Sequence, residues 1–178
     1  SNIVHVDGSI SPVRDIETIN LELVFADIEV LERRIDKTRK MLKSGDKKFQ
    51  IELDICERIK ETLEKGLPAR SIKFSKEEED FVKELFLLTS KPVVYAANVS
   101  ENDLDNIENN RFVKEVMEYA AKEGSEVLVI CAKIEEEIAM LDEQEKAEFL
   151  QALGLKESGL DRLIKVGYRL LGLISFLT

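Results

Sequence analysis

The 178-residue chain is long enough for one domain, or for one domain that carries an inserted segment. Hydrophobic residues make up 44% of it, which is enough to bury a core. The net charge of −10 argues against a protein that is coated with nucleic acid over its whole surface. Tryptophan is absent and other aromatic residues are few, so aromatic platforms for stacking bases are not expected.

The cysteine pattern and the hydropathy pattern both favour a cytoplasmic protein. Cys56 and Cys131 lie far apart without a CxxC pattern, so we expect two small buried side chains in a reducing compartment. No basic region followed by an apolar run marks a signal peptide, and no stretch approaches the ~20 apolar residues of a spanning helix. We therefore expect no membrane association. His5 is the only histidine, and a metal ion needs more ligands than one, so we expect no metal site.

Two helical runs follow a short predicted strand over residues 3–6. The first run begins at Asp15, and a break at residues 44–46 separates it from the second, which ends at Gly66 and Pro68. Apolar or small residues recur at heptad spacing in both: Val24, Ile28, Leu31, Ile35, Thr38 and Leu42, then Phe49, Leu53, Cys56, Ile59 and Leu63. This pattern predicts an antiparallel helical coiled-coil hairpin whose first arm is roughly 40 Å long.

The tip of the predicted hairpin is basic, although the whole chain is acidic. Its cations are Arg33, Arg34, Lys37, Arg39, Lys40, Lys43, Lys47 and Lys48. Along this stretch only Asp36 and Asp46 oppose them. Two interpretations stay open: a solvated helical surface, or a contact with a phosphate backbone such as ribosomal or other RNA.

The remaining elements predict an α/β unit with many helices. Residues 69–75 are expected to be extended, and Ser75 is expected to cap a helix that runs to Leu88. Two buried strands, separated by a polar loop and a helix, indicate a parallel βαβ unit. The ranges expected are a strand over 93–97, a loop over 102–110, a helix over 112–120, a strand over 126–130, and helices over 135–140, 143–153 and 160–174.

The two predicted strands end in residues suited to binding a base. Ligands of open α/β sheets bind at the carboxyl ends of strands. The first strand runs into Asn98-Val99-Ser100-Glu101, and the second runs into Cys131-Ala132-Lys133. Together these tips resemble the paired base-recognition motifs of P-loop GTPases, Asn-Lys-x-Asp and Ser-Ala-Lys.

The departures from those motifs favour adenine. In the GTPases the Asp carboxylate accepts hydrogen bonds from guanine, whereas Glu101 displaces the carboxylate and Val99 replaces the covering Lys, so discrimination against adenine is lost. Asn98 can pair with the N7 and amino edge of adenine, and the Ala132 N–H can reach the base edge. The predicted base-binding residues are Asn98, Val99, Glu101, Cys131 and Ala132. The alternative is a plain loop in which Asn98 is a turn residue.

Further stretches extend the likeness over nearly the whole chain. They are residues 5–9 with 12–17, 65–66 with 68–71, 91–93 with 98–101, and 157–161 with 168–172. With the two strand tips, they resemble the YchF/Obg-like ATPase family, also called EngD. The resemblance implies an α/β fold with large α-helical content, a partial P-loop NTPase (Ras-like) domain that carries the inserted coiled-coil hairpin.

The resemblance also implies a division of the chain and a function. The division expected is an N-terminal remnant of the nucleotide domain over 1–13, the hairpin insertion over 14–90, the C-terminal half of the nucleotide domain over 91–174, and the start of a connection to a TGS domain over 175–178. The full-length protein is expected to bind and hydrolyse ATP with Mg²⁺, to descend from GTPases, and to associate with ribosomes.

The sequence contains no G-x-x-x-x-G-K-[ST] segment and no Mg²⁺-holding switch. We therefore expect a fragment of a larger protein, with no catalytic residues of its own, that hydrolyses no ATP alone, holds no cofactor and self-associates through an open strand edge. The alternative function is a helical interaction module that binds RNA or a ribosomal protein through the basic tip, without nucleotide.

Overall fold

The structure, a computed structural model, describes residues 2–6 and 11–170. Its contacts divide the chain into two units, which are described separately. The α/β unit comprises residues 1–16 and 93–178, and the helical unit comprises residues 17–92. None of the helices in the described part of the chain has both the length and the apolar character needed to cross a membrane.

A parallel sheet organises the α/β unit. Its strand order is β1 (Asn2–Val6), β2 (Val93–Asn98), β3 (Glu126–Ile130), so β2 has a neighbour on each side. The first five residues of β2 are buried, as the continuous apolar run predicted. Helix α4 (Arg111–Glu123) makes the crossover from β2 to β3, which confirms the predicted parallel βαβ unit. Self-association through a sheet edge stays a prediction.

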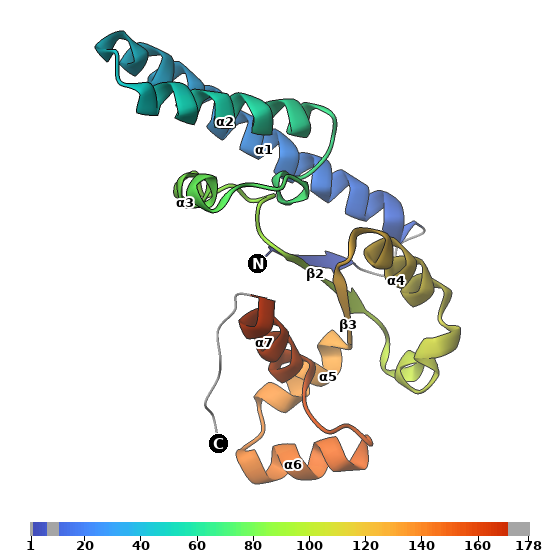
Figure 1. Cartoon of the computed structure of the whole chain (residues 1–178). Helices are drawn as coiled ribbons and strands as arrows, with labels where there is room; N and C mark the ends of the chain where they lie inside the picture. Colours follow the sequence, from blue (N-terminus) through green and yellow to red (C-terminus); the bar gives the residue numbers. More distant parts are fainter. Residues whose placement is uncertain (1, 7–10, 171–178) are drawn as a thin grey trace. The chain divides into compact units, whose positions relative to one another are not determined.

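Helices flank and follow the sheet. Helix α5 (Ala132–Ala139) leaves the end of β3, and α6 (Glu143–Ala152) and α7 (Gly159–Leu170) follow it. Figure 1 shows α4 and α7 on either side of β3. The predicted last helix extends to residue 174, and its final residues lie outside the described part, as do residues 175–178.

Two boundaries in the α/β unit differ from the predictions. Helix α5 begins three residues earlier than expected, directly at the end of β3. The predicted polar loop over 102–110 is instead η3 (Glu101–Asn109), a 3₁₀ segment with a kink at Asn106. Leu104 and Ile107, one on each side of this kink, both pack against the core of this unit.

Two long helices form most of the helical unit. Helix α1 (Pro12–Met41) and helix α2 (Lys47–Glu64) lie side by side, joined by the 3₁₀ turn Leu42–Ser44 (Figure 1). Gly45 makes the reversal possible because its φ of 81° lies in the left-handed region. The helical hairpin is therefore present, while the supercoiled packing of a coiled coil stays a prediction.

The heptad positions of both arms supply the core of the helical unit. The buried ones are Val24, Leu31, Ile35, Thr38, Leu53, Cys56, Ile59 and Leu63. Cys56 is fully buried, and this burial raises the pKa of its thiol to about 11. Both cysteines are buried and free, so they act as the small packed side chains that the sequence predicted.

The segment after the hairpin departs from the predicted extended stretch and long helix. A 3₁₀ turn, η2 (Ala69–Ser71), interrupts the stretch expected to be extended. Helix α3 (Lys76–Glu84) starts at a capping box made by Ser75 and Glu78, as the Ser cap predicted. It ends four residues before Leu88, and just beyond its end Phe86 adopts a φ of 50°. A bulky residue in this region cannot continue a right-handed helix.

A buried carboxylate ties α1 to the segment that follows α3. Asp27, only 1% exposed, accepts hydrogen bonds from the backbone N–H groups of Leu88 and Thr89, at 2.8 and 2.7 Å. The Thr89 hydroxyl also donates to Asp27, at 2.6 Å, and accepts from the N–H of Ala69, at 3.0 Å. The Asp27 carboxylate, directly and through the Thr89 hydroxyl, thus provides partners for backbone N–H groups of the two segments that meet α1.

Replacing Asp27 should therefore destabilise the helical unit strongly. Asp27→Ala leaves two buried backbone donors without their acceptor, and we expect a loss of about 3 kcal/mol in the free energy of unfolding, measured by urea denaturation. Asp36→Ala, an exposed position on the same helix, is the matched control and should change it by less than about 0.5 kcal/mol. Equal losses in the two variants would contradict the role of the buried carboxylate.

Candidate nucleotide-binding corner

The ends of β2 and β3 meet at one edge of the sheet. Their register places Asn98 opposite Ile130, the last residue of β3. The Asn98 Oδ1 accepts a hydrogen bond from the backbone N–H of Ala132, at 3.0 Å, and the N–H of Val99 donates to the carbonyl of Ile130, at 2.8 Å. The structure thus brings together the two strand tips that the sequence singled out.

An ion pair joins the same two tips farther from the sheet. The Lys133 Nζ donates to the Glu101 carboxylate at 3.2 Å, and both side chains are at least half exposed. The hydrogen bond to Glu101 raises the pKa of Lys133, which stays charged at neutral pH. The carboxylate of Glu101, which the sequence predicts to face a base, therefore forms an ion pair with Lys133.

Lys133 was not among the predicted site residues, although the register between β2 and β3 could have indicated that it lies near Glu101. Asn98 lies opposite Ile130, and Glu101 and Lys133 each follow these positions by three residues. The pair is therefore separated by the same 32 positions as the strand partners. Parallel pairing makes residues at a constant offset neighbours beyond the strand ends as well.

The side chains of Val99 and Cys131 serve packing in this structure. Val99 is 7% exposed and packs with Val113 and Val129. Cys131 is 4% exposed and packs with Ile134 beneath the first turn of α5. Contact between the Val99 side chain and a purine face stays a prediction that this burial does not favour. The polar groups of the corner come from Asn98, Glu101, Ala132 and Lys133.

A cavity of about 500 Å³ adjoins the corner within the α/β unit. Glu101 and Cys131 belong to its lining, together with aliphatic side chains of η3 and α5 such as Leu104 and Ile134. The lining also contains charged side chains, among them Asp105, Glu157 and Arg162, so apolar and polar walls are mixed. Asn98 and Ala132 lie outside this lining, beside the cavity.

Glu135, which was not among the predicted site residues, also lines this cavity and fixes the position of α7 beside it. The Glu135 carboxylate accepts from the N–H of Gly159 at 2.7 Å and from that of Leu160 at 3.2 Å. It thus binds the N-terminus of α7, where the helix dipole favours a negative charge. A Cβ on Gly159 would lie 2.7 Å from both Glu135 Oε1 and Ile130 Cγ2. Glycine is therefore required where α5, α7 and β3 converge.

Two glycines of α7 allow a matched test of this close approach. Gly159→Ala should destabilise the chain by about 1–3 kcal/mol, because the new methyl group displaces the Glu135 carboxylate. Gly167→Ala places the same methyl group where no atom lies within 4 Å, and should stabilise the helix by about 0.5–1 kcal/mol. Thermal unfolding of both variants measures the difference, and a stabilising effect at both positions would contradict the packing described.

At the hairpin tip, the expectation that two carboxylates face eight cations is wrong. Glutamates of α1 and α2 pair with half of them: two of the four pairs lie within one helix at i, i+4, and two join the arms of the hairpin. The ion pairs are Arg33–Glu29 at 2.8 Å, Arg34–Glu52 at 3.0 Å, Arg39–Glu57 at 2.8 Å and Lys48–Glu52 at 3.7 Å.

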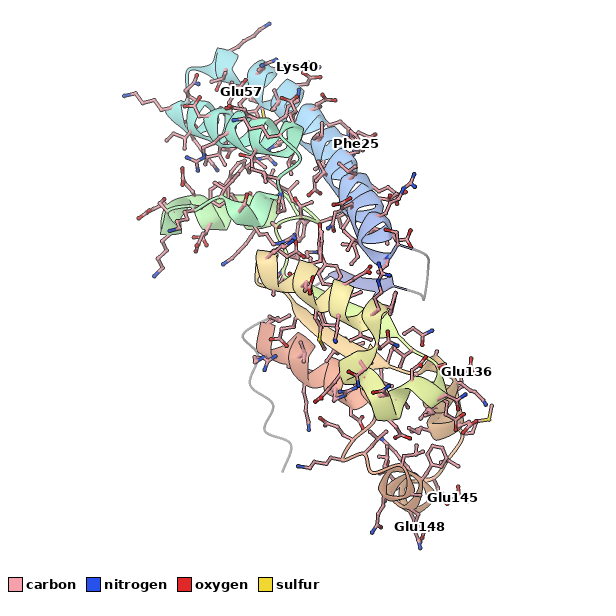
Figure 2. The ribbon with its side chains drawn as sticks, turned by 90° about the vertical axis from the view of Figure 1, so that its right-hand side faces the viewer. Phe25, Lys40, Glu57, Glu136, Glu145 and Glu148 are labelled. Carbon is pink, nitrogen blue, oxygen red and sulfur yellow. The ribbon has the colours of Figure 1, made fainter. Side chains whose placement is uncertain are left out.

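Four lysines at the tip keep an uncompensated charge. Lys37, Lys40, Lys43 and Lys47 are exposed, and none of them forms an ion pair with another described residue. Figure 2 shows Lys40 near the end of the hairpin where the two arms join. The contact of all eight cations with RNA stays a prediction, and these four lysines are the ones whose charge no described ion pair offsets.

Among residues 2–6 and 11–170, no group of three or more His, Cys, Asp or Glu side chains is placed to hold a metal ion. The Mg²⁺ that the family resemblance implies thus finds no fitting ligand set in this part of the chain, and no step below runs through a metal.

The sheet, its helical crossover and the two joined strand tips are those of part of a P-loop NTPase α/β domain, which carries a helical hairpin. No protein-family model matches the sequence. The chain is 51% identical over 177 residues to the Ribosome-binding ATPase YchF of Bacillus subtilis, and 48% identical over 177 residues to that of Haemophilus influenzae. Each match covers 99% of this chain and 48% of the relative.

A solved structure, the YchF GTPase of Schizosaccharomyces pombe, is similar with a TM-score of 0.79 at 26% sequence identity. The similarity covers 95% of this chain and 49% of that one. The chain belongs to the YchF family. It spans about half the length of the curated relatives it matches.

Proposed function

We propose that this chain supplies the base-binding corner and the helical hairpin of a cytoplasmic, ribosome-associated protein that binds and hydrolyses ATP. The observation that carries the proposal is the joined pair of strand tips, with Asn98 bonded to Ala132 and Glu101 paired with Lys133. The relatives named ribosome-binding ATPases support the same assignment.

In this proposal the Asn98 side-chain amide forms hydrogen bonds with the N7 and amino edge of adenine. Its amide is oriented by the Ala132 N–H, which donates to Oδ1. A carbonyl oxygen accepts a second hydrogen bond, so Oδ1 can also accept from the exocyclic amino group of adenine while the amide NH₂ donates to N7. Because the backbone of α5 fixes the amide before a base arrives, less conformational entropy is lost on binding.

Glu101 and Lys133 account for the weakened preference for guanine. Guanine offers a ring N–H and an amino group to a carboxylate, and adenine offers no such pair of donors at that place. With Lys133 at 3.2 Å, the Glu101 carboxylate already has a hydrogen-bond donor when no guanine is present. A site whose acceptor is satisfied in this way penalises adenine less than one whose carboxylate would stay unpaired.

Hydrolysis belongs to the longer protein in this proposal. The 178 residues contain no phosphate-binding G-x-x-x-x-G-K-[ST] segment, and we assign no catalytic residue to them. Magnesium would enter with ATP at the phosphates. The chain alone is expected to bind nucleotide weakly and to hydrolyse none.

A chimera tests the base preference. This chain replaces the matched 177 residues of the Bacillus subtilis relative, and kcat/KM is measured for ATP and GTP. ATP should be preferred. Glu101→Asp should shift the ratio about tenfold toward GTP, the effect of roughly one hydrogen bond to a charged group. Glu108→Asp, the same change elsewhere in η3, is the control.

Three outcomes would contradict the proposal. They are a preference of the unaltered chimera for GTP, an equal effect of Glu101→Asp and Glu108→Asp, and ATP turnover by the 178-residue chain alone that survives Glu101→Ala.

A second candidate function rests on the four unpaired lysines of the hairpin tip. In it the helical unit binds RNA or a ribosomal protein without nucleotide, through electrostatic contacts that carry no sequence preference. The segregation of these lysines from the paired arginines favours it, because unpaired cations gain most from a phosphate backbone.

Changing the four tip lysines together to Gln tests this candidate. For an RNA ligand, the slope of log K against log salt should fall by about 3, since each phosphate contact contributes roughly 0.7–0.9. Co-sedimentation with ribosomes over a range of salt concentrations measures it. A variant with Lys83, Lys114, Lys122 and Lys156 changed to Gln removes the same charge elsewhere. An equal loss of binding in both variants would show that the tip is not the contact.

A further inference from the structure

A groove of about 480 Å³ lies between α2 and α3 in the helical unit. Its floor is apolar and consists of Ile51 and Ile55 of α2 and Phe81 of α3. Ile51 is 59% exposed, so this floor presents an apolar side chain to solvent. The Arg34 guanidinium lies 5.0 Å from the ring centre of Phe81 and supports the floor.

The rim of the groove is acidic. The carboxylates in its lining are Glu52, Glu77, Glu78, Asp80 and Glu84, and the only cation in its lining is Lys48. Arg34 pairs with Glu52 at 3.0 Å, and Arg58 pairs with Glu78 at 3.0 Å.

Three of these carboxylates form no ion pair within the described part of the chain. Glu77, Asp80 and Glu84 are exposed and form no ion pair with another described residue. They follow one another at i, i+3 and i+7, so they lie on one face of α3. Like charges at this spacing repel one another.

We propose that this groove docks a lysine- or arginine-rich segment of another protein. The segment places one or two aliphatic side chains over Ile51 and Phe81, while its cations pair with Glu77, Asp80 and Glu84. Burying the exposed Ile51 supplies the apolar contribution, and the complementary charges orient the segment and speed its association. A phosphate backbone does not fit here, because the unpaired carboxylates would repel it. The groove is thus a second surface, of opposite charge to the hairpin tip.

The test uses the 178-residue chain and two labelled peptides. One peptide has Leu and Lys at helical spacing, and the other has Glu in place of every Lys. Fluorescence anisotropy should show binding of the basic peptide only. The rim variant Glu77→Gln/Asp80→Asn/Glu84→Gln should weaken binding about tenfold, and the floor variant Ile51→Ser about threefold. All four positions are exposed, so both variants should remain folded.

The control variant removes three carboxylates elsewhere. Glu136→Gln/Glu143→Gln/Glu148→Gln alters exposed positions of α5 and α6, two of which are labelled in Figure 2, and should leave binding unchanged. An equal loss in the control, binding of the acidic peptide, or no binding at millimolar concentration would overturn the proposal. Analytical ultracentrifugation adds one further outcome. Self-association that the rim variant abolishes would assign the groove to a second copy of this chain and overturn it as well.

Discussion

The parallel pairing of β2 with β3 is the constraint on which the candidate site depends. It places Asn98 opposite Ile130, and from that register follow both the hydrogen bond to Ala132 and the ion pair between Glu101 and Lys133. A one-residue slip would turn Asn98 to the other face of the sheet and separate these partners. The buried β2, held between two neighbours, makes such a slip unfavourable.

In the helical unit, the four lysines of the hairpin tip and the three groove carboxylates that form no described ion pair lie on different segments. The glutamates of α1 and α2 neutralise the arginines along the hairpin, which leaves four lysines at the tip. Glu77, Asp80 and Glu84 of α3 lie beside the apolar groove and form no ion pair with another described residue. Asp27 holds the segment after α3 against α1. In the two proposals above, one unit offers a cationic end to phosphates and an acidic groove to a basic peptide segment.

Much of this architecture could be predicted from the sequence, because it depends on local patterns. Local sequence patterns indicate three of its features: the apolar run before Asn98, the heptad positions of the hairpin and the Ser75 cap. The contacts that were missed join residues far apart in the chain. The pairing of Arg34 with Glu52 needs the second helix in place, and the capping of α7 by Glu135 needs the close approach at Gly159. The early end of α3 reflects the conformation of Phe86, which helix propensity does not indicate.

The most direct test of the base-binding corner is an NMR titration of the ¹⁵N-labelled 178-residue chain with ATP and with GTP. ATP should shift the backbone amide resonances of residues 98–101 and 131–133 at millimolar concentration, and GTP should shift them less. Shifts confined to other parts of the chain, or tighter binding of GTP at these amides, would contradict an adenine-binding corner formed by the ends of β2 and β3.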